Sequence, residues 1–246
     1  MRSSKGIWNK ENMIEGSRRQ LLKWASLGLF GLSIPKSIDA NVQGTYPSYA
    51  MIVDLERCMG CEACVVSCKI DQNTPQGAFN IKIKSITIGN FPQVRPIFVP
   101  VQCNHCDNPP CLSACSKGAI KKLKSGIVIT DWRLCDGKGQ CIKACPIGAR
   151  HLDERFGNRS FKCDLCIERL EKGLKPACVE TCPSGARIFG DLNNPKGEFR
   201  EYISKKHLFQ YGARFGRGGR IFYAGNENLE SMIPAVENRD EKRDFS

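Results

Sequence analysis

The chain has 246 residues, with 37 Lys and Arg against 25 Asp and Glu and a formal net charge of +12 at pH 7. This length is enough for one or two compact domains after a leader segment. A basic excess of this size is common in nucleic-acid-binding proteins, but the chain also holds 15 cysteines. We assign the excess mainly to counter-charge for metal-bound thiolates, and we exclude nucleic acid from the expected partners.

The N-terminal segment predicts an export signal. Residues 17–23 read SRRQLLK, and a mildly apolar run of eleven residues follows. This matches the twin-arginine pattern S-R-R-x-F-L-K, with leucine at the phenylalanine position, and the apolar run is too short to span a bilayer. An amphipathic helix with a chance arginine pair is the alternative. We expect a twin-arginine signal peptide over 1–40, and a protein of the periplasm or of the outer face of the cytoplasmic membrane.

Short apolar stretches predict strands that lead into cysteine groups. They read YAMIVDLERC, IFVPVQC and GIVITDWRLC. Between the first two, isoleucines alternate with polar residues in NIKIKSITIGNF, at Ile81 and Ile83 and again at Ile86 and Ile88, which predicts a half-buried hairpin within this stretch.

The second half of the chain predicts one helix and one strand. Ile167, Leu170 and Leu174 recur at helical spacing before Pro176, which indicates a helix with these three side chains in the core. RIFYAG near the C-terminus predicts a strand. The following NRDEKRDFS is highly charged, and we expect it to be disordered.

The cysteines form four groups, and every group ends in C-x3-C. The first reads CMGCEACVVSC and the second CNHCDNPPCLSAC. The third, CDGKGQCIKAC, has one cysteine fewer, and Lys138 stands at the missing position. The members are Cys58, Cys61, Cys64 and Cys68, then Cys103, Cys106, Cys111 and Cys115, then Cys135, Cys141 and Cys145, and finally Cys163, Cys166, Cys178 and Cys182.

Three chemistries use thiols at such density. Disulfides fit poorly, because cysteines two residues apart bridge badly and an odd count leaves one unpaired. Structural zinc uses C-x2-C pairs but does not explain the added C-x3-C. The run C-x2-C-x2-C-x3-C is that of bacterial ferredoxins, in which three thiolates hold one cluster and the fourth ligates its neighbour. We therefore predict an α+β fold of two ferredoxin-like 2×[4Fe-4S] units with short strands, small helices and long cluster-binding loops.

No catalytic site is evident from the sequence. His105 and His151 lie near cluster loops and can donate hydrogen bonds there, whereas His207 reads as a surface residue. We find no nucleophile with its base, phosphate loop or flavin site. We expect a non-catalytic electron-transfer subunit rather than an enzyme in its own right.

The layout of the groups resembles the electron-transfer (beta) subunits of the molybdopterin oxidoreductase superfamily. Several stretches are most similar to tetrathionate reductase beta subunits, among them NTPQGAF, CNHCDNPPC, RLEKGLKPACVETC and GARIFGD. The likeness covers about residues 48–192. It implies three [4Fe-4S] clusters and one further cluster. The implied ligand sets are Cys58, Cys61, Cys64 and Cys182; Cys68, Cys163, Cys166 and Cys178; Cys103, Cys106, Cys111 and Cys145; and Cys115, Cys135 and Cys141 beside Lys138.

The same resemblance implies a division into domains. A first dicluster unit with a hairpin insertion would comprise 48–100 and 160–192, and a second would comprise 101–159. Residues 193–246 would form a C-terminal strand and charged tail.

Lys138 makes the fourth cluster different from the others. Some relatives replace this ligand with a non-cysteine residue and hold a three-iron cluster, so we favour [3Fe-4S] here. A labile cubane with a non-thiolate fourth ligand and an empty site are the alternatives.

The resemblance implies a role as an electron relay. Electrons would pass between a membrane-anchor, quinol-oxidising subunit and a molybdopterin catalytic subunit, with tetrathionate reduction as the overall reaction. The chain would meet the membrane only through a partner. Alternatives are the same role in a polysulfide, thiosulfate or arsenate reductase or a hydrogenase complex, or, in another class, a zinc-stapled interaction module.

Replacement of Arg18 and Arg19 by lysine should stop export, because the translocation machinery reads the arginine pair. Fractionation of cells that express the double variant should find it in the cytoplasm. Normal export of this variant would contradict the predicted signal.

Overall fold

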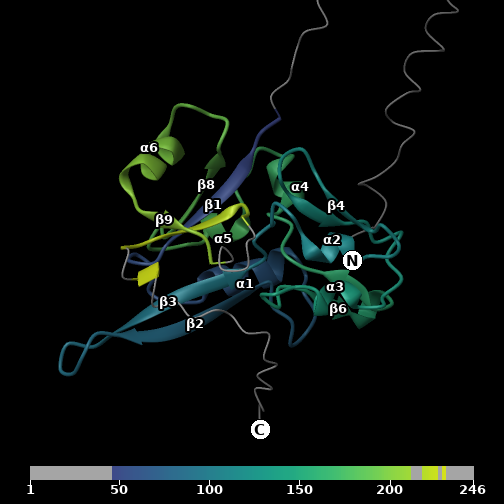
Figure 1. Ribbon diagram of the computed structural model, residues 1–246, viewed down its shortest axis with the longest axis horizontal. Coiled ribbons are helices and arrows are strands. Elements are labelled where there is room, and N and C mark those ends of the chain that lie inside the picture. The colour runs from purple at the N-terminus through teal and green to yellow at the C-terminus, as the bar shows by residue number, and fades with distance from the viewer. Residues whose placement is uncertain (1–45, 212–217, 227–228, 231–246) are drawn as a thin grey trace, which may run out of the picture. The chain divides into compact units, whose positions relative to one another are not determined.

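The computed structural model describes residues 46–211, 218–226 and 229–230, and its largest sheet joins both ends of this region (Figure 1). The strand order is β8-β1-β10-β9. β1 (Tyr49–Asp54) pairs antiparallel with β8 (Arg187–Asp191) and parallel with β10 (Ile221–Ala224). β10 in turn pairs antiparallel with β9 (Leu208–Phe209). Residues 50–54 of β1 are all buried, which explains why its sequence is continuously apolar up to the last residue rather than alternating.

The predicted C-terminal strand is confirmed as β10, and its place in the sheet is central. α6 (Glu198–Lys205) precedes β9 and covers one face of the sheet, where Phe199 packs against Ala50 and Ile52. Within 193–211 and 218–226, α6, β9 and β10 are therefore an integral part of the sheet layer. The charged tail and the export signal both lie outside the described residues.

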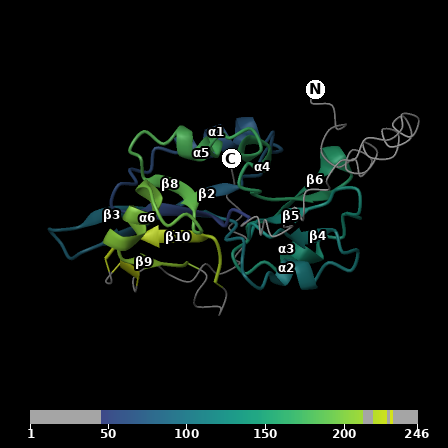
Figure 2. The ribbon, with the colours of Figure 1, turned by 90° about the horizontal axis from the view of Figure 1, so that it is seen from above.

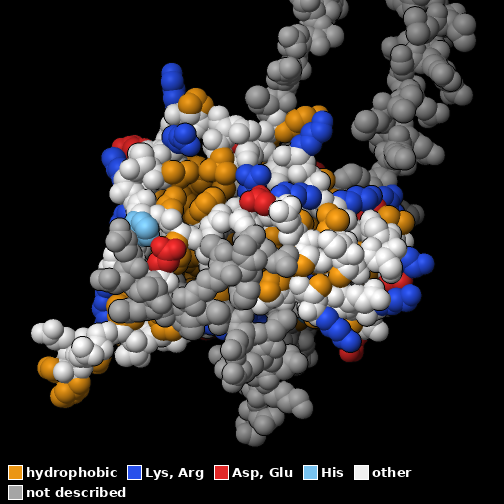
Figure 3. Space-filling model, in the orientation of Figure 1, with side chains coloured by type: hydrophobic (Ala, Val, Ile, Leu, Met, Phe, Trp, Pro, Cys, Tyr) orange, Lys and Arg blue, Asp and Glu red, His pale blue; other side chains and the backbone are white. Residues whose placement is uncertain are grey.

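A long hairpin extends from the sheet layer. β2 (Ile81–Ile88) and β3 (Arg95–Gln102) pair antiparallel along their full length. The prediction of a hairpin within NIKIKSITIGNF was therefore wrong in its extent: all four isoleucines belong to one strand, and the partner strand is the apolar stretch before Cys103. The turn projects into solvent, with Phe91 91% exposed, and its apolar side chains form the orange group at the lower left of Figure 3.

Four short helices carry cysteines and lie in two pairs (Figures 1 and 2). α1 (Ala63–Asp71) lies beside α5 (Ala177–Glu180), and α2 (Pro110–Ser113) lies beside α3 (Gln140–Lys143). Two antiparallel hairpins flank the second pair. They are β4 (Ile120–Lys122) with β5 (Val128–Thr130), and β6 (His151–Asp153) with β7 (Arg159–Phe161).

The helix predicted around Ile167 is shorter than expected. α4 spans Ile167–Leu170, and both of its apolar ends pack against the core. The chain then turns back at Gly173, whose φ of 71° suits a residue without a Cβ. Leu174 therefore falls outside the helix and is 45% exposed, so its predicted place in the core was wrong.

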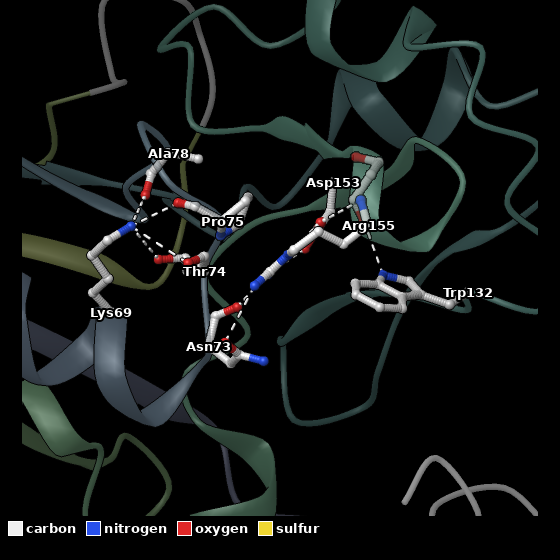
Figure 4. A network of polar contacts seen from close by, with 9 residues as sticks. Lys69, Asn73, Thr74, Pro75, Ala78, Trp132, Asp153 and Arg155 are labelled. Atoms are coloured by element: carbon white, nitrogen blue, oxygen red, sulfur yellow. Dashed lines mark hydrogen bonds and ion pairs between the residues drawn. The ribbon is translucent and has the colours of Figure 1, made fainter. Parts of the chain in front are cut away.

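A polar clip joins the loop after α1 to the segment after β6 (Figure 4). Arg155, in the short 3-10 helix η2 (Glu154–Phe156), donates from Nη2 to the Asn73 carbonyl at 2.6 Å and forms an ion pair with Asp153 at 2.8 Å. Lys69 donates to the carbonyls of Pro75 and Ala78 at 2.7 and 3.1 Å. The NTPQGAF stretch is thus folded over a lysine and tied to a segment about 80 residues away.

The described region mixes short strands and small helices, as expected for the predicted α+β class. Among these residues no helix is long and apolar enough to cross a membrane. The predicted boundaries of two interleaved dicluster units stay a prediction.

Candidate metal centre

The first thiol site is a cavity between the β1–α1 loop and the loop after α5. Its lining includes Cys58, Cys61, Cys64 and Cys182, together with the buried Arg187. We call this group of four cysteines site 1. Cys182 comes from a position more than 110 residues after the other three, so the α1–α5 pairing is what completes the site.

The thiols of site 1 differ in their acidity. Burial raises the pKa of Cys58, and the nearby Cys64 adds to the effect. Burial also acts to raise the pKa of Cys182, but hydrogen bonds from Ser184 and from the backbone of Arg187 and Ala186 outweigh it and lower the pKa below its usual value. The turn after Cys182 is therefore built to stabilise a thiolate.

Site 2 consists of Cys68, Cys163, Cys166 and Cys178. Burial raises the pKa of Cys68 to about 12, with a further contribution from Cys178, while an amide hydrogen bond from Asn80 at 3.8 Å opposes the rise. Cys163 and Cys166 also interact with Cys68, and burial raises the pKa of each. At neutral pH these thiols hold their protons in the absence of metal, and metal binding must displace them.

Site 3 has the same character and consists of Cys103, Cys106, Cys111 and Cys145. Burial raises the pKa of Cys106 to about 12, and Cys103, Cys145 and Cys111 add to the rise in that order. The backbone N–H of Ala149 donates to the Cys145 sulfur at 3.4 Å.

Site 4 is organised around Ser160. The Ser160 N–H donates to the Cys135 sulfur at 3.4 Å, and the Cys141 thiol donates to the Ser160 hydroxyl at 3.3 Å. Cys115 packs against the small apolar cluster that contains Cys141. Lys138 is exposed and pairs with Asp136 at 3.5 Å, so its amine interacts with a surface carboxylate.

Electrostatic interactions and packing link the sites in succession. Cys178 of site 2 interacts with Cys64 of site 1, and Cys163 of site 2 interacts with Cys103 of site 3. Cys111 of site 3 and Cys141 of site 4 belong to one buried cluster. The thiols therefore run through the unit as site 1, site 2, site 3 and site 4.

One histidine, His105, lies among these sites. His105 is fully buried between Cys103 and Cys106, and its Nδ1 accepts a hydrogen bond from the Val128 N–H at 3.0 Å. Burial holds the pKa of His105 far below its usual value, with Lys162 and Arg150 adding to the effect. The neutral ring must then carry its proton on Nε2, which has no partner within the described residues.

The other two histidines differ in exposure. Burial lowers the pKa of His151 to about 4, and its Nε2 is likewise without a partner among the residues described. His207 is 40% exposed and pairs with Glu230 at 3.0 Å, as expected for a surface residue.

Sequence analysis missed three buried polar residues beside the thiols, namely Arg150, Ser160 and Arg187. A signal for the arginines was present, because C-P-x-G-A-R occurs twice, at 145–150 and at 182–187. No comparable signal marks Ser160, whose role depends on the β6–β7 pairing.

The donor sets fit iron–sulfur clusters. The sites offer several buried thiols around shared spaces. Beside them lie N–H groups of His105, Arg150 and Arg187 that have no partner among the described residues. Within 46–211, 218–226 and 229–230, no three His, Cys, Asp or Glu side chains are arranged to hold a single metal ion. An iron–sulfur cluster is larger than a single metal ion, and each thiolate binds a different iron atom. Its ligands therefore surround a space instead of converging on one point.

Comparison with known proteins supports this chemistry. Residues 94–192 match a family model described as a 4Fe-4S dicluster domain. The chain is 39% identical to the B subunit of tetrathionate reductase from Salmonella typhimurium over 231 residues, which cover 89% of this chain and 92% of that protein. It is 37% identical to the B subunit of sulfite dehydrogenase from Allochromatium vinosum, with 68% of this chain and 78% of that one covered.

A further relative is named as an iron–sulfur subunit. The chain is 30% identical to the arsenate respiratory reductase iron–sulfur subunit ArrB of a Shewanella species, over 70% of this chain and 94% of that protein. The chain belongs to the family of iron–sulfur electron-transfer subunits of molybdopterin oxidoreductases. The predicted ferredoxin-like class and electron-transfer role are confirmed for this family member, and the zinc-stapled module is set aside. The ligand sets stay a prediction.

Double substitutions test which cysteines share a cluster. Cys64→Ala and Cys182→Ala should each leave three thiolates at site 1 and lose about one iron atom, as expected for a three-cysteine site. The double variant should lose the whole cluster, about four iron atoms, because only two thiolates remain at one site. The Cys64→Ala, Cys178→Ala double variant should lose only about two, since sites 1 and 2 each keep three thiolates.

Iron and acid-labile sulfide analysis of the purified proteins gives these counts. A loss of only about two iron atoms in the Cys64 and Cys182 pair would contradict the assignment of site 1.

Proposed function

We propose that this chain is the electron-transfer subunit of a tetrathionate reductase complex. It would relay electrons between a membrane-anchor, quinol-oxidising subunit and a molybdopterin catalytic subunit. The linear order of the four thiol sites is the observation that carries the relay. Similarity to the tetrathionate reductase protein of Salmonella typhimurium over 89% of the chain supports the choice of complex.

The proposed cofactors are three [4Fe-4S] clusters at sites 1 to 3 and one [3Fe-4S] cluster at site 4. When bound, each cluster accepts and releases one electron at a time. Sites 1 to 3 offer four cysteines each, whereas site 4 offers three. The ion pair of Lys138 with Asp136 supports the smaller cluster, because it holds the amine at the surface.

The protein's own contribution is to bind the clusters, to shield them from water and to fix their orientation. The cysteines anchor the clusters, and the eight that are buried shield their sulfur atoms from water. The donors at Ser160, His105 and the Ala149 backbone fix the position of individual sulfurs or offer hydrogen bonds beside them. Such hydrogen bonds and the exclusion of water are the means by which a protein sets cluster potentials.

The proposed location is the periplasm or the outer face of the cytoplasmic membrane. The twin-arginine pattern around Arg18 supports it. This pathway exports folded proteins, so the clusters can be inserted before translocation.

Assembly with partner subunits tests the proposed role. A complex of this chain with its molybdopterin and quinol-oxidising subunits should reduce tetrathionate with electrons from quinol. Cys178→Ala should slow quinol-driven turnover sharply, because it alters the cluster at site 2, which lies inside the relay. An artificial donor that reduces the catalytic subunit directly should still support turnover.

Substrate preference separates the related complexes. Faster turnover with polysulfide, thiosulfate or arsenate than with tetrathionate would assign the relay to one of those reductases. Unchanged quinol-driven activity in Cys178→Ala would contradict the relay itself.

Lys138→Cys should convert site 4 to a cubane. Iron should rise from about 15 to about 16 atoms per chain, since a fourth thiolate completes the cluster. The paramagnetic signal of an oxidised three-iron cluster should disappear, because oxidised four-iron cubanes give none. Lys143→Cys is the matched control, since Lys143 is exposed on α3 and lies outside the CDGKGQC loop.

The control should leave both the iron content and the signal unchanged. Wild-type protein with about 16 irons and no oxidised signal would show a fourth ligand at site 4, and about 12 irons would show an empty site. Either result would rule out the three-iron assignment.

A further inference from the structure

Two buried arginines occupy equivalent positions in the chain. Arg150 and Arg187 each end a C-P-x-G-A-R sequence, five residues after the last cysteine of a group. Gly148 and Gly185 give the turn a φ of 58° and 60°, which places the arginine at or just before a strand. Each arginine is only 4% exposed. The turn therefore occurs twice, and each time it places an arginine guanidinium in the interior.

Arg187 lies between sites 1 and 2. Its Nη1 donates to Gln102 Oε1 at 2.6 Å and lies 3.8 Å from the Cys178 sulfur. Burial alone would lower the pKa of Arg187, but the interaction with Cys178 and Cys64 in their thiolate form, the form that binds metal, outweighs burial and raises the pKa. Cys178 belongs to site 2 and Cys64 to site 1, so one guanidinium faces both.

Arg150 has the same relation to sites 3 and 4. Its Nη1 donates to Thr130 Oγ1 and Ser160 Oγ, each at 3.1 Å. Burial acts to lower the pKa of Arg150, and the thiolates of Cys111, Cys103 and Cys141 together raise it. The first two of these belong to site 3 and the last to site 4.

A third buried cation lies at the junction of sites 2 and 3. Lys162 is 5% exposed, and its Nζ donates to the carbonyls of Val128 and Cys163 at 2.5 and 2.6 Å. It precedes Cys163 of site 2 and acts electrostatically on His105, which lies between two cysteines of site 3. Each step along the order of sites thus contains one buried cation.

These cations have no carboxylate partner in the part of the chain that the structure describes. No ion pair there includes Arg150, Lys162 or Arg187, and the Nη2 groups of both arginines lack any hydrogen-bond acceptor among the described residues. A buried charge without a counter-ion is strongly unfavourable. The anions beside the two arginines are the thiolates of the sites, and Lys162 also interacts electrostatically with the carboxyl of Asp164.

We propose that Arg187, Lys162 and Arg150 form a series of fixed cations, one between each two successive sites, that raises the reduction potential of the cluster on either side. Reduction adds a negative charge to a cluster, and a cation held in a low-dielectric interior stabilises the added charge. Because each cation has a cluster on both sides, it acts on both. The inference rests on the proposed function, since it requires clusters at all four sites.

Neutral variants test this with redox titration rather than activity. The purified, iron-loaded protein is titrated anaerobically, and paramagnetic resonance follows each one-electron step. Arg187→Gln should make reduction of the clusters at sites 1 and 2 less favourable. The equilibrium constant of each reduction should fall about tenfold, which lowers each reduction potential by about 59 mV for a one-electron couple. Arg150→Gln should move the other two steps. Lys162→Met should lower the reduction potentials of the clusters at sites 2 and 3.

Charge-retaining variants separate charge from packing. Arg187→Lys and Arg150→Lys keep the cation and should leave the potentials near those of the wild type. Lys196→Gln removes an exposed positive charge and should move no step. If a glutamine variant does not accumulate, methionine at the same position is titrated in its place.

The outcomes distinguish the inference from the proposed function. Wild-type protein without iron, sulfide or redox steps would contradict the proposed function. The inference alone would be overturned if the wild-type protein shows four reduction steps and the neutral variants leave all four reduction potentials unchanged, or shift all four equally. Iron loss in every neutral variant would assign these residues a structural role and would also overturn it.

Discussion

Buried sulfur is the constraint on which the rest of this structure depends. α1 is nine residues long, yet the proposed ligand sets assign its Cys64 and Cys68 to two different sites. Residues four apart lie one turn apart on the same side of a helix. The helix can therefore supply both sites only when this one side faces both of them. The thiols of Cys64, Cys68, Cys163 and Cys178 are also members of the main apolar core. The interior is therefore incomplete as a purely organic core, and metal binding is coupled to folding.

Charge is distributed in two ways around that interior. At the surface, Arg155 and Lys69 hold loops through carbonyls and a carboxylate, which are ordinary partners for cations. In the interior, Arg187 and Arg150 lie against thiols and a few neutral acceptors. The basic excess of the sequence thus has a specific component that faces the sites, and formal charge counted on free thiols overstates the positive charge of the loaded protein.

The chemistry of this chain could be predicted from its sequence because cysteine spacing is local and specific. Strands before the groups were also predictable, since continuous apolar runs next to turn residues carry a strong signal. The extent of the β2–β3 hairpin was not, because Ile81 to Ile88 alternate equally well in one strand or in two. Leu174 was misplaced because helical periodicity does not register the reversal at Gly173. Arg187 and Arg150 were missed because a buried arginine is rare, and only the shared turn that precedes them indicates their environment.

Each site takes cysteines from segments that lie apart in the sequence. The sites therefore receive their last cysteine in a fixed order during synthesis on the ribosome. With the proposed ligand sets, the last cysteine needed by site 4 is Cys141, and the last needed by site 3 is Cys145. Sites 2 and 1 wait for Cys178 and Cys182. β1 gains its parallel neighbour only when Ile221–Ala224 has emerged. Because domains fold from the N-terminus as synthesis proceeds, one end of the relay can be loaded while the ribosome is still extending the chain that closes the other.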